Sequence, residues 1–514
     1  MGWMSIKEYR DKVLGCWMGK NIGGTLGAPL EGKRGVSDID FYTQDLRGQA
    51  LPNDDLDLQL VWLLAVEKYG RAVNASILGE YWLSFIVPNW SEYGMGKSNL
   101  RMGLVPPLSG WVNNLNRDSD GAFIRSELWA CLAPGHPEIA VRYAYEDAIV
   151  DHSEEGVYGE IFCAAVQSAA FAEGDKKKLI DIGLSYIPQD CGIARGVRSV
   201  IASREQGLDW KEARKAVLRE VPDAFFYTYL GEKEPDLPRG RTGYDAPANV
   251  SLFVLGWLYG EDDFGRSLCI AAGCGEDTDC TAATLGATLG IIHGFQAIPE
   301  KWKEPIGDKI VTISINRGDQ GHLIANTVQE LTERVLRQTP RFLDERYVDT
   351  VNAKEGYAVQ LNEGQALACQ PRELFSGYQR TFAEDVLQRQ PFSVRYETPL
   401  YIAWLEYGRE PLIKSGEPFP LTLHFENTLR QPLWINLAWH LPEGWQISPA
   451  RESAFSLTFN AGGWAGIGKV TFTLTPGPLS QVRYDLFVDV RSDGRHTRLV
   501  IPITLLAAAD GSSF

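Results

Sequence analysis

The chain has 514 residues, of which 44% are hydrophobic and 23% are charged, and its formal net charge is −16. This is the composition of a globular protein with apolar area for two or three cores, and its acidic balance argues against a nucleic-acid partner, because phosphate binding needs a basic surface. The longest apolar run, 250–259, is too short to cross a bilayer, so no membrane partner is expected.

The cysteines and the start of the chain indicate a reducing compartment. The N-terminal residues enter a helical pattern directly, without an apolar export segment. The eight cysteines show no Cys-x-x-Cys pair, and several, such as Cys163, stand in apolar helical runs. We therefore expect reduced thiols in a cytoplasmic protein. The seven histidines are scattered without ligand spacing, so a zinc site is not expected.

Residues 1–340 are predicted to form an all-α domain. Ser5 can cap a first helix, and the apolar face of that helix carries Ile6, Tyr9, Val13 and Trp17. Further helical patterns cover 56–67, 139–149, 158–172, 281–292 and 329–337, the last ending before Pro340. No convincing alternating strand interrupts them.

A glycine-spaced segment, 15–31, follows the start of the first helix. Its spacing matches neither a Walker loop nor a dinucleotide-binding fingerprint. We expect a helix that packs closely through its glycines and ends before Pro29. Glu31 then emerges directly after the helix end, a common place for a carboxylate that acts on a substrate. Taken alone, an ordinary exposed glutamate is the commoner outcome.

Two acidic clusters, 53–55 and 277–279, carry most of the chemical information. Each stands where an irregular stretch with Gly or Pro meets an apolar helix. Two pairs of carboxylates from two helix starts could hold one or two hard cations such as Mg²⁺ or Mn²⁺. The alternative is helix capping, but a cap needs one carboxylate rather than two, so the doubled clusters favour a cation site.

Beyond Pro340 the pattern changes from helical to alternating. Strands are predicted over 421–425, 433–439, 454–459, 469–474, 483–490 and 497–505. Short strands at this spacing predict a small antiparallel sandwich, immunoglobulin-like, over 411–514. Residues 341–410 are expected to form a connector that is partly β.

Three motifs in order carry a family resemblance. They are Gly-Ala-Pro-Leu-Glu at 27–31, the Asp54-Asp55 pair at a helix start, and Gly-x-Asp-Thr-Asp at 275–279 before a Gly- and Ala-rich helix. Together they resemble the ADP-ribosylglycohydrolases, whose fold is shared with dinitrogenase reductase-activating glycohydrolase, from residue 8 to about 335.

The resemblance implies an all-α domain that holds two divalent metals, Mg²⁺ or Mn²⁺, in a cleft and hydrolyses the bond joining ribose to a modified side chain or small group. It implies metal ligation by Asp54, Asp55, Asp277 and Asp279. It also implies that Glu31 lies near the metal and the scissile bond, with Glu31, Asp54 and Asp279 as the catalytic residues.

Two residues of the metal motifs depart from the family pattern. Asn53 and Cys280 stand where the family usually has Thr or Ser. An amide oxygen can still be a neutral ligand, whereas a thiol is a poor ligand for Mg²⁺. We count both among the metal-site residues and expect one metal position to be weaker, absent or differently ligated.

Two further segments are expected to line the cleft. Residues 120–125 resemble the family's Gly-Ala-x-x-Arg stretch, which makes Asp120, Gly121 and Arg125 candidate substrate residues. His152 stands where the family usually has a Thr-His pair, and the resemblance makes it a substrate contact or a structural tie. Without the resemblance, His152 is equally well an ordinary residue at a helix start.

The predicted function is metal-dependent hydrolysis at the anomeric carbon of ribose in ADP-ribosyl conjugates, with Glu31 as general base or as a stabiliser of oxocarbenium-like charge. One alternative is a metal-dependent glycosidase or nucleosidase for another small sugar, which the departures at Asn53 and Cys280 and the appended sandwich favour. Another is a non-catalytic binding or structural descendant, which the retained aspartates argue against. The substrate partner is a small glycoside or an ADP-ribosyl compound; the sequence does not indicate the oligomeric state.

Overall fold

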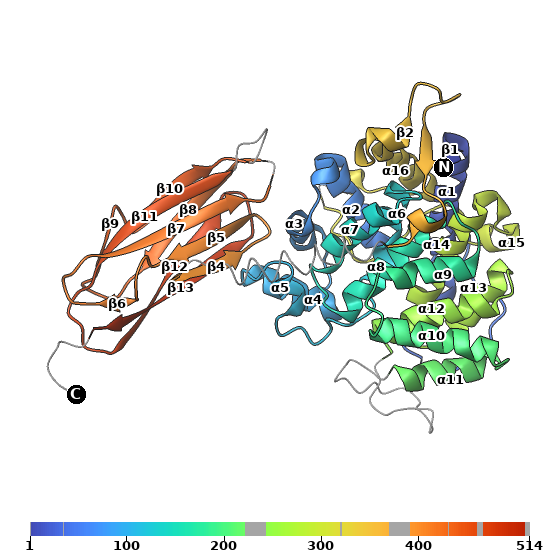
Figure 1. Cartoon of the computed structure of the whole chain (residues 1–514), viewed down its shortest axis with the longest axis horizontal. Helices are drawn as coiled ribbons and strands as arrows, with labels where there is room; N and C mark the ends of the chain where they lie inside the picture. Colours follow the sequence, from blue (N-terminus) through green and yellow to red (C-terminus); the bar gives the residue numbers. More distant parts are fainter. Residues whose placement is uncertain are drawn as a thin grey trace.

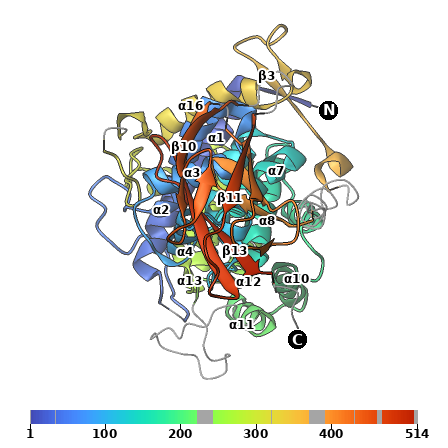
Figure 2. The same ribbon diagram turned by 90° about the vertical axis from the view of Figure 1, so that its left-hand side faces the viewer.

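The chain forms a helical body and a β-sandwich that lie side by side, as the computed structural model shows (Figure 1, Figure 2). The structure describes residues 2–33, 35–221, 243–318, 321–369, 391–429, 431–459 and 466–508. Within these ranges, every helix is too short or too polar to cross a bilayer. The all-α body followed by a β-rich domain agrees with the predicted fold class.

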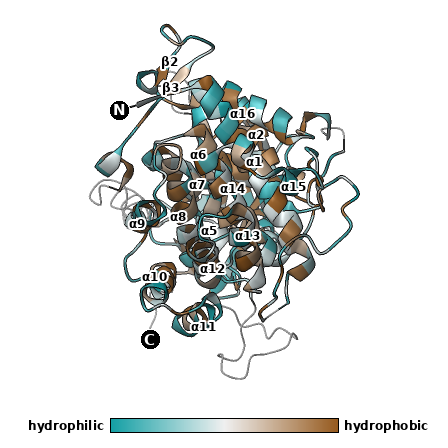
Figure 3. Cartoon of the chain, turned by 90° about the vertical axis from the view of Figure 1, so that its right-hand side faces the viewer, coloured by the Kyte–Doolittle hydropathy of each residue, from teal (hydrophilic) through white to brown (hydrophobic). Residues whose placement is uncertain are grey.

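The helices of the body share one large apolar core. Their bounds are α1 (Ile6–Gly27), α2 (Asp54–Tyr69), α3 (Ala75–Phe85), α4 (Ser91–Arg101), α5 (Leu108–Trp111), α6 (Glu127–Leu132), α7 (Pro137–Ala148), α8 (Glu155–Ala169), α9 (Lys176–Ser185), α10 (Gly192–Glu205), α11 (Trp210–Glu220), α12 (Ala246–Tyr259), α13 (Phe264–Gly273), α14 (Thr278–His293), α15 (Glu300–Lys303) and α16 (Val328–Phe342). The apolar α14 lies in the middle, whereas outer helices such as α10 and α16 show both polar and apolar faces (Figure 3). This pattern explains why the sequence showed amphipathic stripes for some helices and unbroken apolar runs for others.

The N-terminus corrects one expectation. Residues Gly2–Ser5 form a strand, β1, that pairs with β3 (Ala358–Leu361), which also pairs with β2 (Val348–Asp349). The prediction that the chain enters a helix directly is therefore wrong, because these residues form a strand before the helix begins. The sequence pattern did not show this strand, because its partner lies far along the chain. Ser5 caps α1 as predicted, its hydroxyl oxygen accepting a hydrogen bond of 3.3 Å from the backbone N–H of Glu8.

The last helix of the body corrects another expectation. Helix α16 runs through Pro340 to Phe342 instead of ending before the proline. A proline inside a helix removes the N–H that would bond to the carbonyl four residues earlier. That carbonyl, of Leu336, accepts a hydrogen bond of 2.6 Å from the hydroxyl of Tyr357. A side chain from outside the helix thus satisfies the acceptor that the proline leaves open.

Helices α1 and α14 pack with their backbones in contact. The contact surface of α1 consists of glycines at every fourth position, Gly15, Gly19, Gly23 and Gly27, as the glycine spacing predicted. A methyl group at Gly19 would overlap the carbonyl of Gly286, and one at Gly27 would overlap the carbonyl of Thr278. Because Gly15 meets Gly290 while Gly27 meets Thr278, the two helices run in opposite directions, and the end of α1 lies beside the start of α14.

The C-terminal domain consists of two five-stranded sheets. One has the strand order β10-β8-β12-β13-β6 and the other β4-β5-β7-β11-β9. Their bounds are β4 (Ser393–Glu397), β5 (Tyr401–Glu406), β6 (Leu412–Ile413), β7 (Phe419–Asn427), β8 (Leu433–His440), β9 (Gln446–Ser448), β10 (Glu452–Leu457), β11 (Ile467–Thr475), β12 (Arg483–Ser492) and β13 (Arg498–Ala507). The pairing of β13 with β6 is parallel and the rest are antiparallel. Aromatic contacts such as Trp439 with Phe472 join the two sheets.

The domain boundaries differ from those expected. Strands β4 and β5 fall within 341–410, the predicted connector, yet β5 pairs with β7 and belongs to the sandwich. The sandwich therefore begins before residue 411. The first part of the predicted connector packs on the helical body, since β3 pairs with β1. The local pattern could not show this division, because pairing across the sheet assigns each strand to its domain.

The two domains meet at Glu80 on α3. Its carboxylate accepts a hydrogen bond of 2.8 Å from the hydroxyl of Thr497 and lies 3.7 Å from the guanidinium of Arg495. A cavity of about 400 Å³ lies at this junction, lined from the end of α2, from α3 and from the sandwich. None of the predicted site residues lines it, so this cavity is separate from the acidic clusters.

The glycine contact gives a first prediction. Gly19→Ala places a methyl group against the backbone of α14, which cannot move aside as a side chain can, and should destabilise the helical body by about 2–3 kcal/mol. The matched control is Gly174→Ala at an exposed position with open space around it. We expect calorimetry to show a lower melting midpoint of the helical body for Gly19→Ala only. Equal midpoints for the two variants would contradict the contact.

Candidate metal centre

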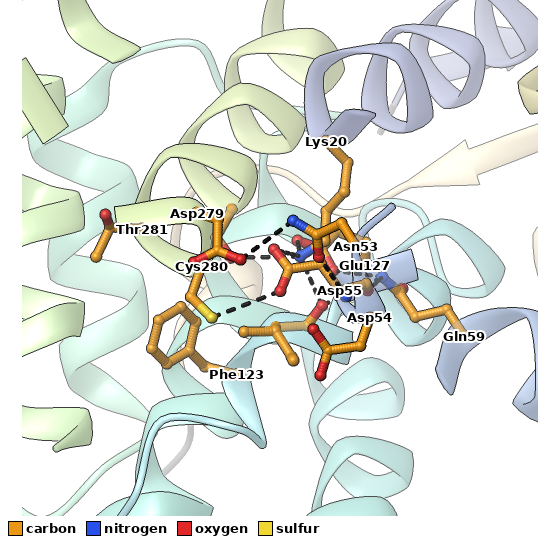
Figure 4. A network of polar contacts seen from close by, with 12 residues as sticks. Lys20, Asn53, Asp54, Asp55, Gln59, Phe123, Glu127, Asp279, Cys280 and Thr281 are labelled. Atoms are coloured by element: carbon orange, nitrogen blue, oxygen red, sulfur yellow. Dashed lines mark hydrogen bonds and ion pairs between the residues drawn. The ribbon is translucent and has the colours of Figure 1, made fainter. Parts of the chain in front are cut away.

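The start of α2 is capped by Asn53, which frees the two aspartates that follow. The amide oxygen of Asn53 accepts a hydrogen bond of 2.7 Å from the backbone N–H of Asp55. Its amide nitrogen donates to Asp279 Oδ2 at 3.2 Å. Asn53 thus caps one helix and ties it to the start of another (Figure 4). The capping alternative holds for the asparagine and leaves the carboxylates of Asp54 and Asp55 without that role.

The start of α14 presents carboxylates that do not cap it. Asp277 occupies the cap position, but its side chain makes no capping hydrogen bond. Asp277 Oδ1 and Asp279 Oδ1 are buried, and neither has a hydrogen-bond partner among the described residues. Thr278, between them, donates its hydroxyl to the carbonyl of Gly27 at 2.8 Å. This bond fixes the start of α14 to the end of α1, just before Glu31.

Two groups of donor atoms form where these helix ends meet. Glu31, Asp277 and Asp279 make one, and Asp55, Asp279 and Cys280 make the other. In each group, one donor atom from every residue lies within 4.8 Å of the others. Asp279 belongs to both groups. The structure therefore brings together five of the predicted site residues, from the segment after α1 and from the starts of α2 and α14.

The charges in these groups need compensation. Burial raises the pKa of Asp279 to about 7, and the charge of Glu31 adds to the effect. Burial and then the neighbouring carboxylates raise the pKa of Asp277 well above the ordinary value, and burial does the same for Asp55 although the charge of Lys20 opposes it. Glu31 keeps surface open to solvent, but burial of its carboxyl end, with the charges of Asp54 and Asp55, raises its pKa to about 7. A divalent cation fits this donor set, because it would compensate buried carboxylates that otherwise repel one another.

The carboxylate of Asp55 forms an ion pair with a buried lysine, Lys20. Lys20 Nζ lies 3.8 Å from Asp55 Oδ2 and 3.0 Å from Glu127 Oε1, and it donates to the carbonyl of Ile124 at 2.6 Å. Gln59 donates to Glu127 Oε2 at 2.9 Å and completes the network (Figure 4). We did not single out these residues in the sequence. The signal was a lysine within an apolar, glycine-rich helix, which needs a buried acidic partner.

Asp54 lies at the edge of the centre. It is half-buried, its Oδ2 accepts a hydrogen bond of 2.8 Å from the hydroxyl of Tyr93, and it belongs to neither donor group. Two neighbouring polar residues, Asp57 and Thr281, have other partners. Asp57 accepts hydrogen bonds from the backbone N–H groups of 313–314, and Thr281 donates to the carbonyl of Thr278 and points away from the centre (Figure 4).

Asp120, predicted to contact substrate, lies against the second acidic cluster. Its Oδ2 accepts a hydrogen bond of 2.5 Å from the amide of Asn249, whose oxygen accepts from the backbone N–H of Asp277 at 3.2 Å. A methyl group at the neighbouring Gly121 would overlap the carboxylate of Glu92. Asn249 thus holds Asp120 and Asp277 together, whereas Gly121 packs against Glu92. Asn249 carries no sequence signal of its own, because it stands inside an apolar helix.

Arg125 and His152, also predicted to contact substrate, are fully buried and support the loop that carries Asp120. The guanidinium of Arg125 lies 2.5 Å from Asp151 Oδ1 and 2.8 Å from Asp147 Oδ1. His152 contacts Asp151 at 2.9 Å through Nδ1 and Ser119 at 2.8 Å through Nε2. Neither side chain exposes surface to a ligand. This arrangement favours a positioning role for both residues.

The Arg125–Asp151 pair predicts an acid-sensitive stability. Burial alone would raise the pKa of Asp151, but the charges of Arg125 and His152 outweigh it and lower this pKa to about 2. The unfolded value is about 3.9, so the pair's contribution is complete above about pH 4 and is lost as the pH falls towards 2. The contribution is about 2–3 kcal/mol.

We expect Asp151→Asn to be less stable than the parent protein at pH 7, because it leaves a buried guanidinium without its charge partner. Its melting midpoint should change less between pH 4 and pH 2, since the titrating carboxyl is gone. The exposed Asp181→Asn is the control. Identical pH profiles for Asp151→Asn and the parent protein would rule out this role.

Comparisons with known proteins agree with the geometry. A family model described as ADP-ribosylglycohydrolase matches residues 5–341, more than half of the chain. No curated protein matches the sequence.

Three solved structures show weak similarity. An ADP-ribosylglycohydrolase-related protein complex is 18% identical, covering 66% of this chain and 99% of its own, with a TM-score of 0.43. PapD-like domain 7 of human CEP192 is 17% identical, covering 24% of this chain and 92% of its own, with a TM-score of 0.15. The alkylpurine DNA glycosylase AlkC of Pseudomonas fluorescens is 12% identical, covering 90% and 100%, with a TM-score of 0.14. These scores are too low to support an argument, so the family model is the comparison that carries weight.

Proposed function

The chain belongs to the ADP-ribosylglycohydrolase family, and from this premise we propose that it is a metal-dependent hydrolase that cleaves the bond at the anomeric carbon of ribose in an ADP-ribosyl conjugate. The observation that carries the proposal is the pair of donor groups that share Asp279. Their buried carboxylate oxygens without hydrogen-bond partners are costly unless a cation compensates them.

The cation would be Mg²⁺ or Mn²⁺, in one or two positions. Glu31, Asp277 and Asp279 would hold it in one position, and Asp55 and Asp279 would contribute to the other. Asn53, whose two polar ends cap α2 and bond to Asp279, orients these ligands. A bound ion would supply charge neutralisation and Lewis-acid polarisation.

Glu31 is the residue best placed to exchange a proton with a substrate. It lies after the end of α1 and keeps surface open to solvent. In the proposed reaction, water attacks the anomeric carbon and loses a proton to Glu31, while the glycosidic bond breaks and the leaving group takes up a proton from solvent. Asp54, held by Tyr93, and Asp120, held by Asn249, are oriented at the edge to contact the sugar.

A second candidate is a metal-dependent glycosidase or nucleosidase for another small sugar. The observation that favours it is Cys280, a thiol within a donor group where the family usually places a hydroxyl. The appended β-sandwich is consistent with either substrate class. A non-catalytic descendant of the fold is the least favoured, because such a protein has no need for the converging carboxylates.

Loss of Asp279 should remove both donor groups at once. We expect Asp279→Ala to lower turnover at least about a thousandfold, which corresponds to several kcal/mol of lost transition-state stabilisation. The fold should survive, because the substitution relieves repulsion among buried carboxylates. The control, Asp181→Ala, changes an exposed aspartate on α9 and should leave turnover unchanged.

The measurement is release of product from a panel of ADP-ribosyl conjugates, nucleosides and simple glycosides, with Mg²⁺ or Mn²⁺ and after chelation. Release of ADP-ribose supports the first candidate, and release of another sugar alone supports the second. Full activity of Asp279→Ala, or activity that survives chelation, would overturn the metal-dependent proposal. If calorimetry shows that the protein binds no divalent cation, this result would favour the non-catalytic descendant.

A further inference from the structure

One of the two donor groups contains sulfur. Cys280 lies in the first turn of α14, is 8% exposed, and has its sulfur 3.5 Å from Asp55 Oδ1. Figure 4 shows the thiol pointing towards Asp55 from the same helix start as Asp279. Among the residues that the structure describes, the other group, Glu31, Asp277 and Asp279, offers carboxylate oxygens alone. The centre therefore has two chemically unlike positions.

We propose that the group of Asp55, Asp279 and Cys280 binds a thiolate-accepting divalent cation such as Zn²⁺ in preference to Mg²⁺, with Cys280 as a direct ligand. The inference rests on the proposed metal centre and concerns the identity of one of its ions. The all-oxygen group keeps its preference for a hard cation. The two positions would then hold different metals.

The donor chemistry supports this selectivity. Mg²⁺ takes oxygen ligands and gives up its water reluctantly, whereas Zn²⁺ is bound readily by thiolate together with carboxylate. A thiol that filled this position would remove one oxygen ligand from a Mg²⁺ site. In a Zn²⁺ site, the same thiol would add a strong sulfur ligand.

The buried carboxylates supply the second, independent observation. Asp279 Oδ1 is buried and has no hydrogen-bond partner among the described residues, whereas Asp55 Oδ2 faces Lys20 Nζ at 3.8 Å. Asp55 and Asp279 are only 1% and 6% exposed. One carboxylate oxygen from each of Asp55 and Asp279 lies within 4.8 Å of the Cys280 sulfur, and the unpartnered oxygen of Asp279 points to a ligand that an isolated buried cysteine would not need.

The charge balance is consistent with a bound thiolate. On binding, the sulfur–hydrogen bond breaks, the proton leaves to solvent and the sulfur donates its electron pair to the cation, with no change of oxidation state. Two carboxylates and a thiolate carry three negative charges around a doubly charged ion. Lys20, with its ammonium 3.8 Å from Asp55 Oδ2, lies on the protein side of the group and reduces the excess only in part, because the same ammonium lies 3.0 Å from Glu127 Oε1.

The alternative is that Cys280 is a buried thiol that donates a weak hydrogen bond to Asp55. The remaining seven cysteines are also buried and free, so burial alone does not identify a ligand. What distinguishes Cys280 is that, within the described ranges, it is the one cysteine placed in a donor group with two carboxylates. Direct observation of a metal–sulfur bond separates the two interpretations.

The test uses the full chain after chelation, titrated with Cd²⁺ as a spectroscopic substitute for Zn²⁺. We expect an ultraviolet charge-transfer band from a cadmium–thiolate bond, present in the parent protein and in the control Cys269→Ser, and absent in Cys280→Ser and Cys280→Thr. Competition with a chromogenic chelator should show Zn²⁺ affinity about 10- to 100-fold lower in the two Cys280 variants. Mg²⁺ affinity should be unchanged or higher.

Two variants guard against misfolding, since serine keeps the size of the thiol and threonine restores the hydroxyl usual in the family. A parent protein without the band, or a band that persists in both Cys280 variants, would overturn the assignment. These outcomes are independent of turnover. Hydrolysis with Mg²⁺ but no charge-transfer band would contradict the thiolate site and leave the proposed function intact. A band without hydrolysis would support the thiolate site and contradict the proposed function.

Discussion

The contact between the backbones of α1 and α14 is the constraint on which the candidate centre depends. Glycines at every fourth residue of α1 remove the side chains that would hold the helices apart, so the carbonyls of one helix lie where a methyl group of the other would be. Because the helices run in opposite directions, the end of α1 meets the start of α14. Glu31 therefore reaches Asp277 and Asp279, and any displacement of this contact would separate them.

Burial of like charge shapes the rest of the centre. The carboxylates of Asp55, Asp277 and Asp279 share a space almost closed to water, which is unfavourable unless positive charge lies nearby. On the protein side, Lys20 supplies this positive charge, and Glu127 in turn balances the charge of Lys20. On the open side a cation is the natural complement. The same principle holds further out, where buried Arg125 is balanced by aspartates and the loop bearing Asp120 is anchored.

The two residues that depart from the family pattern, Asn53 and Cys280, contribute to the centre in different ways. Asn53 performs two tasks with one amide, capping α2 with its oxygen and bonding to Asp279 with its nitrogen. Its amide therefore joins the starts of α2 and α14. Cys280 keeps the position of a ligand but changes its chemistry. The first departure preserves the geometry of the centre, and the second replaces a hydroxyl with a thiol within a donor group.

The sequence by itself determined the helical body, the β-rich second domain and the two acidic clusters at helix starts, because helical periodicity, strand alternation and doubled aspartates are local signals. It did not show that β1 pairs with β3, that Tyr357 allows α16 to continue through Pro340, or that β4 and β5 belong to the sandwich. Nor did it show Lys20 beneath Asp55, or Arg125 turned inward. Each of these depends on a partner far along the chain, and only tertiary packing decides which distant groups share a buried space.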